Sequence, residues 1–357
     1  MDSKLAQRRG PGRDASADAS VDLTRLLDLV GAFPLQTVCV LGDMVLDEFV
    51  SGEISRVSRE APVLILRHRH TEAFPGGAAN AVNNLAALDA QVLPVGVVGK
   101  DASGEALVGF LRGKRVDVSG IVSAADCTTT TKTRYLAGWT HATEQQVLRV
   151  DHEPRILLPV RVQRAIERNA RRMAKRADAV LVSDYGLGAA TPSLVRRIRA
   201  RILTLDSRYR LREFRGARIT AATPNESEIE AAYQTTVGAD AHRLGDVGQR
   251  ALHELGLAAL VVTRGKDGMT VFEPTARGPR GPRTIPIYGS DAPVDVTGAG
   301  DTVIAAFTLA LAAGASYFEA AHLANYAAGI AVMKKRTATV SRAELEVALR
   351  REATAQR

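Results

Sequence analysis

The stretch DVTGAGDT, residues 295–302, decides the fold, because its glycine-rich turn runs directly into the apolar segment VIAAFTLALAAG at residues 303–314. Gly298 and Gly300 permit a tight turn without a Cβ, so that free N–H groups at the start of a helix can face one anion. Asp301 lies at this junction, where its carboxylate can accept the proton of an attacking hydroxyl. We interpret the motif as a phosphoryl-transfer site. The alternative is that Asp301 is only an N-cap and the glycines only a loop.

The composition indicates a globular chain with a large core. Its 357 residues are 46% hydrophobic, enough for one large α/β domain with an appendage. No apolar run approaches the roughly 20 residues that cross a bilayer, and MDSKLAQRRGPGRDASADAS lacks the apolar part of a secretory signal. Cys39 and Cys127 have neither the spacing of a zinc site nor the density of a disulfide scaffold. We therefore expect a cytoplasmic protein without membrane insertion, and a disordered tail over residues 1–20.

The net charge of +8 raises the question of nucleic-acid binding. The basic residues concentrate in Arg161–Arg176 and in Arg196–Arg218, and the first of these segments also has apolar residues at helical spacing. No aromatic side chains interleave with the charges, so both segments are typical of solvated helix or loop surfaces. We expect no nucleic-acid partner, and a surface that suits small anionic substrates.

Short apolar runs alternate with helical patterns from residue 38 onward. The runs are TVCVLGD, VLPVGVVG, DAVLVSDYG, RILTLDSR, ARITAATPN and LAALVVTRG. This alternation predicts an α/β fold with a doubly wound, mostly parallel sheet flanked by helices. Two segments, about 47–73 and 128–153, have strand patterns without intervening helices and predict a small β-sheet lid. We assign residues 21–357 to one domain that includes this lid.

Polar residues follow five of the apolar runs: Asp43, Asp184, Asp206, Asn225 and Thr263. Each of them alone is typical of a turn or a cap. In an open α/β sheet, however, ligands bind beyond the carboxyl ends of the strands. Five such residues on successive strands therefore favour a binding site at that edge.

The segment PGGAAN is a candidate sugar contact. Gly76 and Gly77 stand at the start of a predicted helix, where exposed backbone can approach a ligand closely. Asn80 can exchange hydrogen bonds with sugar hydroxyls. The alternative is a tight turn with a structural asparagine.

The segments TPNESE and VTRGKDG are candidate nucleotide contacts. Asn225 and Glu228 are three residues apart and share one helix face, which can point toward hydrated Mg²⁺ and nucleotide phosphates. The alternative is a well-capped helix. Thr263 and Gly265 follow a strand and would pack near the nucleotide.

The occurrence, in order, of GD, PGGAAN, TPNESE, VTRGKDG and DVTGAGDT resembles the ribokinase-like (PfkB) carbohydrate kinases from about residue 38 to 348. The resemblance implies an ATP- and Mg²⁺-dependent sugar kinase with Asp301 as catalytic base and an anion hole formed by Gly298, Ala299 and Gly300. It assigns ATP to Asn225, Glu226, Ser227, Glu228, Thr263, Gly265 and Asn325, with Glu228 bound to Mg²⁺ through water. It assigns the sugar to Asp43, Asp47, Gly76, Gly77, Asn80, Lys132, Arg134 and Asp184. Asp295 and Thr297 would bind a monovalent cation such as K⁺.

Within that family, several segments are most similar to the D-glycero-β-D-manno-heptose-7-phosphate kinases: GDMVLDEFVSGEISRVSREAPV, TKTRYL, QQVLRVDHE, SDYG and TATVS. These enzymes phosphorylate the anomeric hydroxyl of heptose 7-phosphate on the way to ADP-heptose and lipopolysaccharide. Lys132, Arg134 and Arg149 would then meet the 7-phosphate, or else be solvated lid charges. The resemblance also implies a homodimer through the lid sheet.

Several positions depart from that pattern. Leu187 stands in place of a lysine, Ser207 and Arg208 replace a Pro-Lys pair, and Arg336 replaces a glycine beside the presumed cation loop. These changes leave the acceptor and the cation requirement open. The acceptor alternatives are another sugar, a sugar acid or a nucleoside, and the alternative class is a catalytically inactive sugar or nucleotide sensor. We expect adenylyl transfer to require a separate protein.

Overall fold

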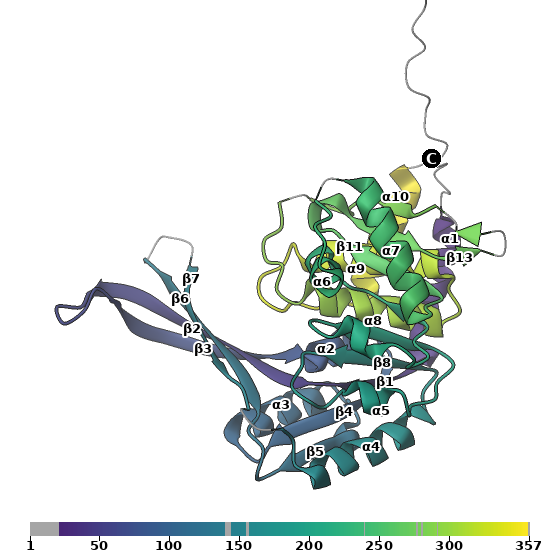
Figure 1. Ribbon diagram of the computed structural model, residues 1–357. Coiled ribbons are helices and arrows are strands. Elements are labelled where there is room, and N and C mark those ends of the chain that lie inside the picture. The colour runs from purple at the N-terminus through teal and green to yellow at the C-terminus, as the bar shows by residue number, and fades with distance from the viewer. Residues whose placement is uncertain are drawn as a thin grey trace, which may run out of the picture.

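The computed structural model describes residues 21–139, 144–154, 157–238, 240–275, 278–279, 281–290 and 292–355. Figure 1 shows an α/β body with helices on both faces of a central sheet, and a second, smaller sheet that projects from it. The tail predicted over residues 1–20 lies outside the described residues. None of the helices in the described ranges is long and apolar enough to cross a membrane.

The central sheet has nine strands in the order β15-β12-β11-β10-β9-β8-β1-β4-β5. Their bounds are β1 Thr37–Gly42, β4 Gln91–Gly99, β5 Ile121–Ala124, β8 Ala179–Asp184, β9 Leu203–Ser207, β10 Ala221–Ala222, β11 Ala259–Thr263, β12 Met269–Phe272 and β15 Arg283–Ile285. The strands from β5 to β11 in this order pair in parallel, and β12 and β15 form an antiparallel edge. Nearly continuous Val, Leu and Ile runs fit a parallel sheet buried on both faces. The predicted fold class is confirmed.

Two helical layers enclose this sheet. One face is covered by α1 Leu23–Gly31, α2 Ala78–Ala87, α3 Ala102–Gly113, α8 Ala299–Ala312, α9 Tyr317–Ala331 and α10 Arg342–Ala355. The other is covered by α4 Val160–Ala174, α5 Pro192–Val195, α6 Glu226–Tyr233 and α7 Ala241–Leu255. Every residue of α8 from Asp301 to Ala312 is buried. An apolar helix of this kind belongs in a core, and it carries Asp301 inward with it.

The smaller sheet has the strand order β3-β2-β6-β7. Its strands are β2 Met44–Val57, β3 Leu64–Gly77, β6 Thr130–Gly138 and β7 Gln145–His152, and a separate short hairpin joins β13 Pro274–Thr275 to β14 Gly278–Pro279. We call the four-stranded sheet the lid. These strands overlap the two segments predicted to form the lid, about 47–73 and 128–153, but β2 begins three residues before the first segment and β3 ends four residues after it. Residues 140–143 of the second segment lie outside the described residues. In the lid, Asp47 on β2 is in register with Lys132 on β6.

Candidate active site

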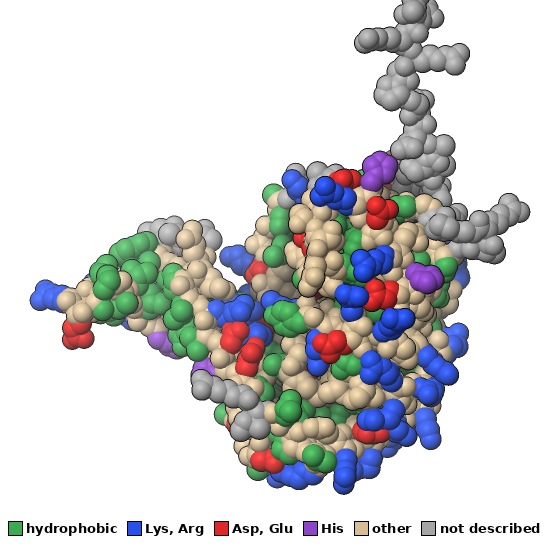
Figure 2. Space-filling view, in the orientation of Figure 1, with side chains coloured by type: hydrophobic (Ala, Val, Ile, Leu, Met, Phe, Trp, Pro, Cys, Tyr) green, Lys and Arg blue, Asp and Glu red, His purple; other side chains and the backbone are tan. Residues whose placement is uncertain are grey.

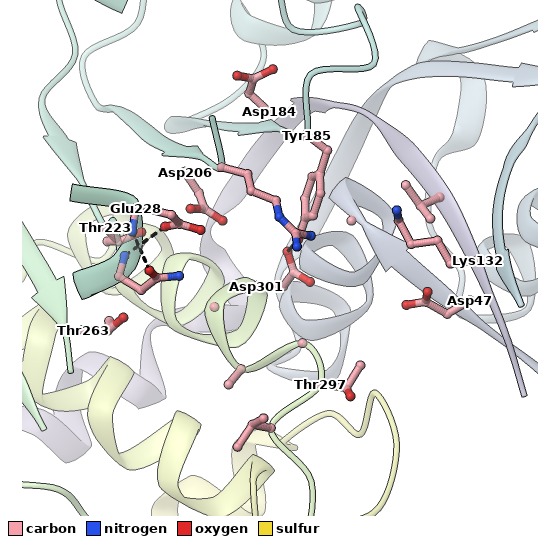
Figure 3. Close-up of a pocket in the computed structure, with 18 of the residues that line it drawn as sticks. Asp47, Lys132, Asp184, Tyr185, Asp206, Thr223, Glu228, Thr263, Thr297 and Asp301 are labelled. Atoms are coloured by element: carbon pink, nitrogen blue, oxygen red, sulfur yellow. Dashed lines mark hydrogen bonds between the residues drawn. The ribbon is translucent and has the colours of Figure 1, made fainter. Parts of the chain in front are cut away.

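A cleft of about 390 Å³ opens where the carboxyl ends of the central strands meet the lid. The strand ends contribute Asp184, Tyr185, Asp206, Arg208, Thr223 and Thr263. The starts of α6 and α8 contribute Asn225, Glu228, Val296, Thr297, Gly298, Ala299, Gly300 and Asp301. The lid and its root contribute Val45, Asp47, Gly77, Lys132, Arg134 and Arg149. In the view of Figure 3, Asp301 lies between Glu228 on one side and Asp47 on the other.

Asp301 is a buried carboxylate at the start of α8, with only 4% of its surface exposed. Its Oδ2 accepts a hydrogen bond from Nδ2 of Asn80 at 2.9 Å, and its Oδ1 accepts one from the hydroxyl of Tyr185 at 2.9 Å. Burial raises the pKa of Asp301 to about 7, although these two hydrogen bonds act to lower it. Since the N-cap of α8 is Gly298, the alternative that Asp301 is merely an N-cap is wrong. A carboxyl with a pKa near neutrality suits a general base.

The turn before Asp301 leaves backbone donors open. Among the described residues, the N–H groups of Gly300 and Asp301 have no acceptor, whereas Ala299 donates to the carbonyl of Val296 at 3.2 Å. Gly298 has φ +80°, and a Cβ there would lie 2.4 Å from Nδ2 of Asn80. Glycine is therefore required both by the backbone conformation and by the neighbour that binds Asp301. The open amides at a helix start can stabilise a phosphoryl group.

Asn225 and Glu228 form a capping box at the start of α6. Asn225 Oδ1 accepts from the Glu228 N–H at 2.8 Å, and Glu228 Oε2 accepts from the Asn225 N–H at 2.9 Å. The well-capped helix considered as the alternative is thus present, while both side chains also line the cleft.

Asp206 and Glu228 bring two carboxylates to one side of the cleft. Burial raises the pKa of both groups, and repulsion from Glu228, Asp301 and Asp184 raises that of Asp206 further. A bound cation would relieve this repulsion. Within the described ranges, no three His, Cys, Asp or Glu side chains converge as a complete metal site. The carboxylate oxygens of Asp206 and Glu228 are of the kind that a hydrated Mg²⁺ accepts, and such an ion takes few ligands from the protein.

Four of the predicted ATP residues lie away from the cleft lining: Glu226, Ser227, Gly265 and Asn325. The Glu226 carboxylate pairs with Nε of Arg264 at 3.0 Å. Asn325 donates to the carbonyl of Pro286 at 2.8 Å, which joins α9 to the segment after β15. Thr263, by contrast, lines the cleft and bridges to Asn225.

The predicted acidic sugar contacts have different surroundings. Asp47 lines the cleft and receives Nη1 of Arg134 at 2.6 Å. Asp184 also lines the cleft, but its buried carboxylate binds the hydroxyl of Ser207 at 2.7 Å and the guanidinium of Arg210. Its negative charge is therefore already compensated within the protein.

Asp43 lies behind the cleft lining. Its carboxylate accepts the N–H groups of Tyr185, Leu187 and Ala189 at 2.9, 3.1 and 2.9 Å. Burial raises its pKa to about 6, and the nearby charge of Asp184 adds to this, while the three amides lower it. In this structure Asp43 holds the loop after β8, the loop that presents Tyr185.

The two glycines at the end of β3 allow close packing at the root of the lid. A Cβ on Gly76 would lie 2.6 Å from Oδ2 of Asp47, and Gly77 has φ +55° at the N-cap of α2. Gly77 also lines the cleft. A side chain at either position would displace Asp47 or the start of the helix that carries Asn80.

The lid presents three cations to the cleft: Lys132, Arg134 and Arg149. Each is paired with an acid. Lys132 Nζ lies 3.2 Å from Asp151 and 2.9 Å from Glu153, and Arg149 Nε lies 2.9 Å from Asp151. The side chains of Lys132 and Arg134 are only 12% exposed, so these two are not freely solvated charges.

Two backbone N–H groups donate to the carboxylate of Asp295, in the loop that the sequence resemblance assigns to a monovalent cation. Asp295 Oδ1 accepts the N–H of Thr297 at 2.9 Å, and its Oδ2 accepts the N–H of Arg336 at 2.8 Å. Arg336 has φ +63°. That left-handed conformation favours glycine, the residue that the sequence pattern led us to expect there.

Tyr185 and Arg208 also line the cleft, and neither is among the site residues predicted from the sequence. Tyr185 is the third residue of the quoted motif SDYG, directly after Asp184. Its position directly after the last residue of β8 is the sequence signal that could identify it as a cleft residue.

Comparison with known sequences gives one family. The sequence model for the pfkB family carbohydrate kinases matches residues 36–148 and 199–344. The bifunctional protein HldE of Desulfatibacillum aliphaticivorans is 38% identical over 328 residues, which cover 90% of this chain and 64% of that relative. HldE of Geobacter sulfurreducens is 40% identical over 317 residues, with 86% and 61% covered. The chain thus spans less than two thirds of the length of these relatives.

Solved structures share the fold at low sequence identity. Arabidopsis thaliana ribokinase complexed with ribose and ATP has a TM-score of 0.65 at 20% identity, covering 88% of this chain and 98% of its own. Escherichia coli phosphofructokinase-2 in complex with potassium has a TM-score of 0.71 at 18% identity, covering 90% and 99%.

Proposed function

The chain belongs to the pfkB family of carbohydrate kinases, and from this premise we propose that it transfers the γ-phosphoryl group of ATP to a hydroxyl of a phosphosugar. The observation that carries the proposal is the buried Asp301, held by Asn80 and Tyr185 directly beside the open N–H groups of Gly300 and Asp301. This arrangement combines a base for an alcohol with donors for a phosphoryl group.

In the proposed reaction, the oxygen of the acceptor hydroxyl bonds to the γ-phosphorus of ATP while Asp301 takes the proton of that hydroxyl. The bond between the γ-phosphorus and the β-phosphate oxygen breaks, and ADP is released. The amides of Gly300 and Asp301 stabilise charge on the transferring group. Glu228 and Asp206 would hold Mg²⁺ through its water shell, and bound Mg²⁺ would neutralise phosphate charge. Asp295 and Thr297 remain the proposed site of a monovalent cation such as K⁺. Because the reaction draws on ATP, we place it in the cytoplasm.

We propose D-glycero-D-manno-heptose 7-phosphate as the acceptor, phosphorylated at its anomeric hydroxyl. The lid supports a phosphorylated substrate, since Lys132, Arg134 and Arg149 all face the cleft. A doubly charged phosphate can compete with Asp47, Asp151 and Glu153 for these cations, and guanidinium groups bind phosphate through two parallel hydrogen bonds. The choice of sugar rests on the sequence segments that resemble heptose-7-phosphate kinases.

We further propose a homodimer formed through the lid. The lid and its connections expose large apolar side chains: Val57, Val63, Leu64, Trp139, Val147 and Leu148. Figure 2 shows apolar side chains gathered along this projecting sheet. A contiguous apolar surface on an open sheet supports pairing with a second copy. Light scattering should give a dimer for the wild type and a monomer for Leu148→Lys; a wild-type monomer at micromolar concentration would rule the proposal out.

The deciding experiment is an ADP-release assay with Mg-ATP and a panel of acceptors. The panel holds heptose 7-phosphate, the same heptose without phosphate, other sugar phosphates, a sugar acid and a nucleoside. We expect the highest kcat/KM with heptose 7-phosphate. Turnover confined to unphosphorylated acceptors would refute the phosphosugar assignment and retain the kinase. Binding of ATP without ADP release on any acceptor would instead indicate an inactive sensor.

A further inference from the structure

Arg336 occupies a backbone conformation that its own β-carbon disfavours. It lies between α9 and α10 with φ +63°, in the left-handed region. Its side chain is nevertheless only 19% exposed and makes specific contacts. A non-glycine residue held in this region points to a role for the side chain.

The guanidinium of Arg336 reaches the lid. Its Nη2 lies 2.6 Å from Oε2 of Glu72 on β3, and its Cζ lies 4.8 Å from the ring centre of Phe49 on β2. The ring of Phe49 also receives Cζ of Arg134 at 5.3 Å, and Arg134 binds Asp47 in the cleft wall. Arg336 is therefore attached to the part of the lid that carries two proposed substrate contacts.

This attachment differs from the other ion pairs of the lid. The Arg336–Glu72 pair joins the lid, residues 44–77 and 130–153, to the rest of the protein. Six other ion pairs of the lid join two residues within those ranges: Arg69–Glu53, His70–Glu72, Lys132–Asp151, Lys132–Glu153, Arg134–Asp47 and Arg149–Asp151.

The backbone of Arg336 holds the loop that leads to the anion hole. Its N–H donates to Oδ2 of Asp295 at 2.8 Å, and Oδ1 of the same carboxylate accepts the N–H of Thr297 at 2.9 Å. The next residue, Thr337, lies against the turn before α8, since a Cβ added to Gly298 would lie 3.5 Å from the Cγ2 of Thr337. One residue thus contacts the lid with its side chain and the anion-hole loop with its backbone.

We propose that Arg336 is a positioning residue that couples the lid to the anion-hole loop, so that the acceptor is held and water is excluded when the phosphoryl group is aligned. The proposal rests on the proposed kinase function. Its physical basis is that a charge-assisted contact and a cation–π contact act together on the lid, at a point fixed to the loop through Asp295. The coupling requires the side chain, whereas the bond to Asp295 requires only the backbone.

The variant Arg336→Gly separates these two contributions, because glycine accepts φ +63° and keeps the N–H that binds Asp295. We expect the KM for the phosphosugar to rise about 5- to 30-fold, while the KM for ATP stays unchanged. ATP hydrolysis without acceptor should rise relative to phosphosugar turnover. Arg336→Lys should restore part of the acceptor KM, since it keeps the charge but not the planar fork.

The matched control is Arg69→Ala, which removes an ion pair that stays within the lid, Arg69–Glu53 at 3.2 Å. A readout independent of catalysis is amide hydrogen exchange over residues 44–50 and 71–77, which should be faster in Arg336→Gly and unchanged in Arg69→Ala. An unchanged acceptor KM with unchanged exchange would overturn the coupling. So would equal effects of both variants. If the wild type phosphorylates no acceptor, the proposed function fails, and the exchange experiment still decides whether Arg336 holds the lid.

Discussion

Removal of one hydroxyl next to Asp301 should move the pH dependence of the reaction. In the variant Tyr185→Phe, the ring stays and only the donor to Oδ1 of Asp301 is lost. The base must be ionised to accept a proton, and its pKa is already raised to about 7 because it is buried. Asp47 and Glu228 raise the pKa further through their negative charge, and the hydrogen bonds from Asn80 and Tyr185 oppose this. Loss of Tyr185 therefore has a definite sign: the pKa of Asp301 goes up.

The size of the effect follows from the hydrogen bond. A bond to a charged acceptor contributes roughly 1.5–3 kcal/mol, and 1.36 kcal/mol corresponds to one pH unit, so the midpoint should rise by about 1 to 2 pH units. At pH 7 the ionised fraction of Asp301 would fall from about one half to between about 1% and 10%. We expect kcat at pH 7 to fall about 5- to 50-fold, with most of the loss recovered at pH 9.

The assay is ADP release at saturating Mg-ATP, with kcat and kcat/KM for the acceptor measured from pH 6 to 9.5. The control variant is Tyr209→Phe, since Tyr209 is 70% exposed and its ring contacts Arg208. The control should keep the wild-type midpoint. If Tyr185→Phe lowers the rate equally at every pH, Tyr185 only shapes the cleft and the reasoning about the base is refuted.

Three further changes test the same site. Asp301→Asn should lower kcat by a factor of about 10² to 10⁴. The pKa of Asp301 in the folded protein, about 7, lies above its value in the unfolded chain, so ionisation of this carboxylate destabilises the fold increasingly from about pH 4 to 7. The variant should therefore melt at a higher temperature than the wild type at pH 8 but not at pH 4. Gly298→Ala should cost about 1–3 kcal/mol in urea unfolding and lower kcat, because φ is +80° and the new Cβ would meet Asn80 at 2.4 Å; normal stability would contradict the strained turn. Glu228→Gln should raise the Mg²⁺ concentration for half-maximal rate about tenfold with little change in melting temperature, since the bond from the Glu228 N–H to Asn225 remains; an unchanged Mg²⁺ titration would remove Glu228 from the metal site.

The sequence predicted the parallel sheet because its strands are apolar on both faces and therefore conspicuous. It did not predict the antiparallel edge, because Met269–Phe272 and Arg283–Ile285 are short and follow turn-rich segments. Of the five residues singled out at strand ends, Asp184, Asp206, Asn225 and Thr263 line the cleft, whereas Asp43 lies behind it and binds the loop after β8. The predicted lid was found for a similar reason: strand patterns without helices stand out in an α/β chain.

The hydrogen-bond and ion-pair partners of the site carboxylates could not be predicted from the sequence. Asp43 binds amides that lie 142 to 146 residues away, and Asp184 binds Arg210 from another strand end. Strand-end position predicts proximity, but it does not say which carboxylate is neutralised by a partner and which is left to act on a ligand. Only the three-dimensional arrangement separates Asp301, bound by two neutral donors, from Asp184, bound by a cation.

The residues that hold Asp301 and the residue that holds the lid should therefore act independently. Asn80 and Tyr185 hold Asp301 within the body, on α2 and at the end of β8, and they affect the protonation of the base. Arg336 contacts the lid through Glu72 and Phe49, and it affects how the acceptor is held. Because no hydrogen bond or ion pair among the described residues joins Arg336 directly to Tyr185 or Asn80, the free-energy effects of Tyr185→Phe and Arg336→Gly should add within about 0.5 kcal/mol. A larger coupling energy would mean that the loss of Arg336 moves the lid enough to change the effect of the Asp47 charge on Asp301, and the base and the lid would then have to be treated as one unit.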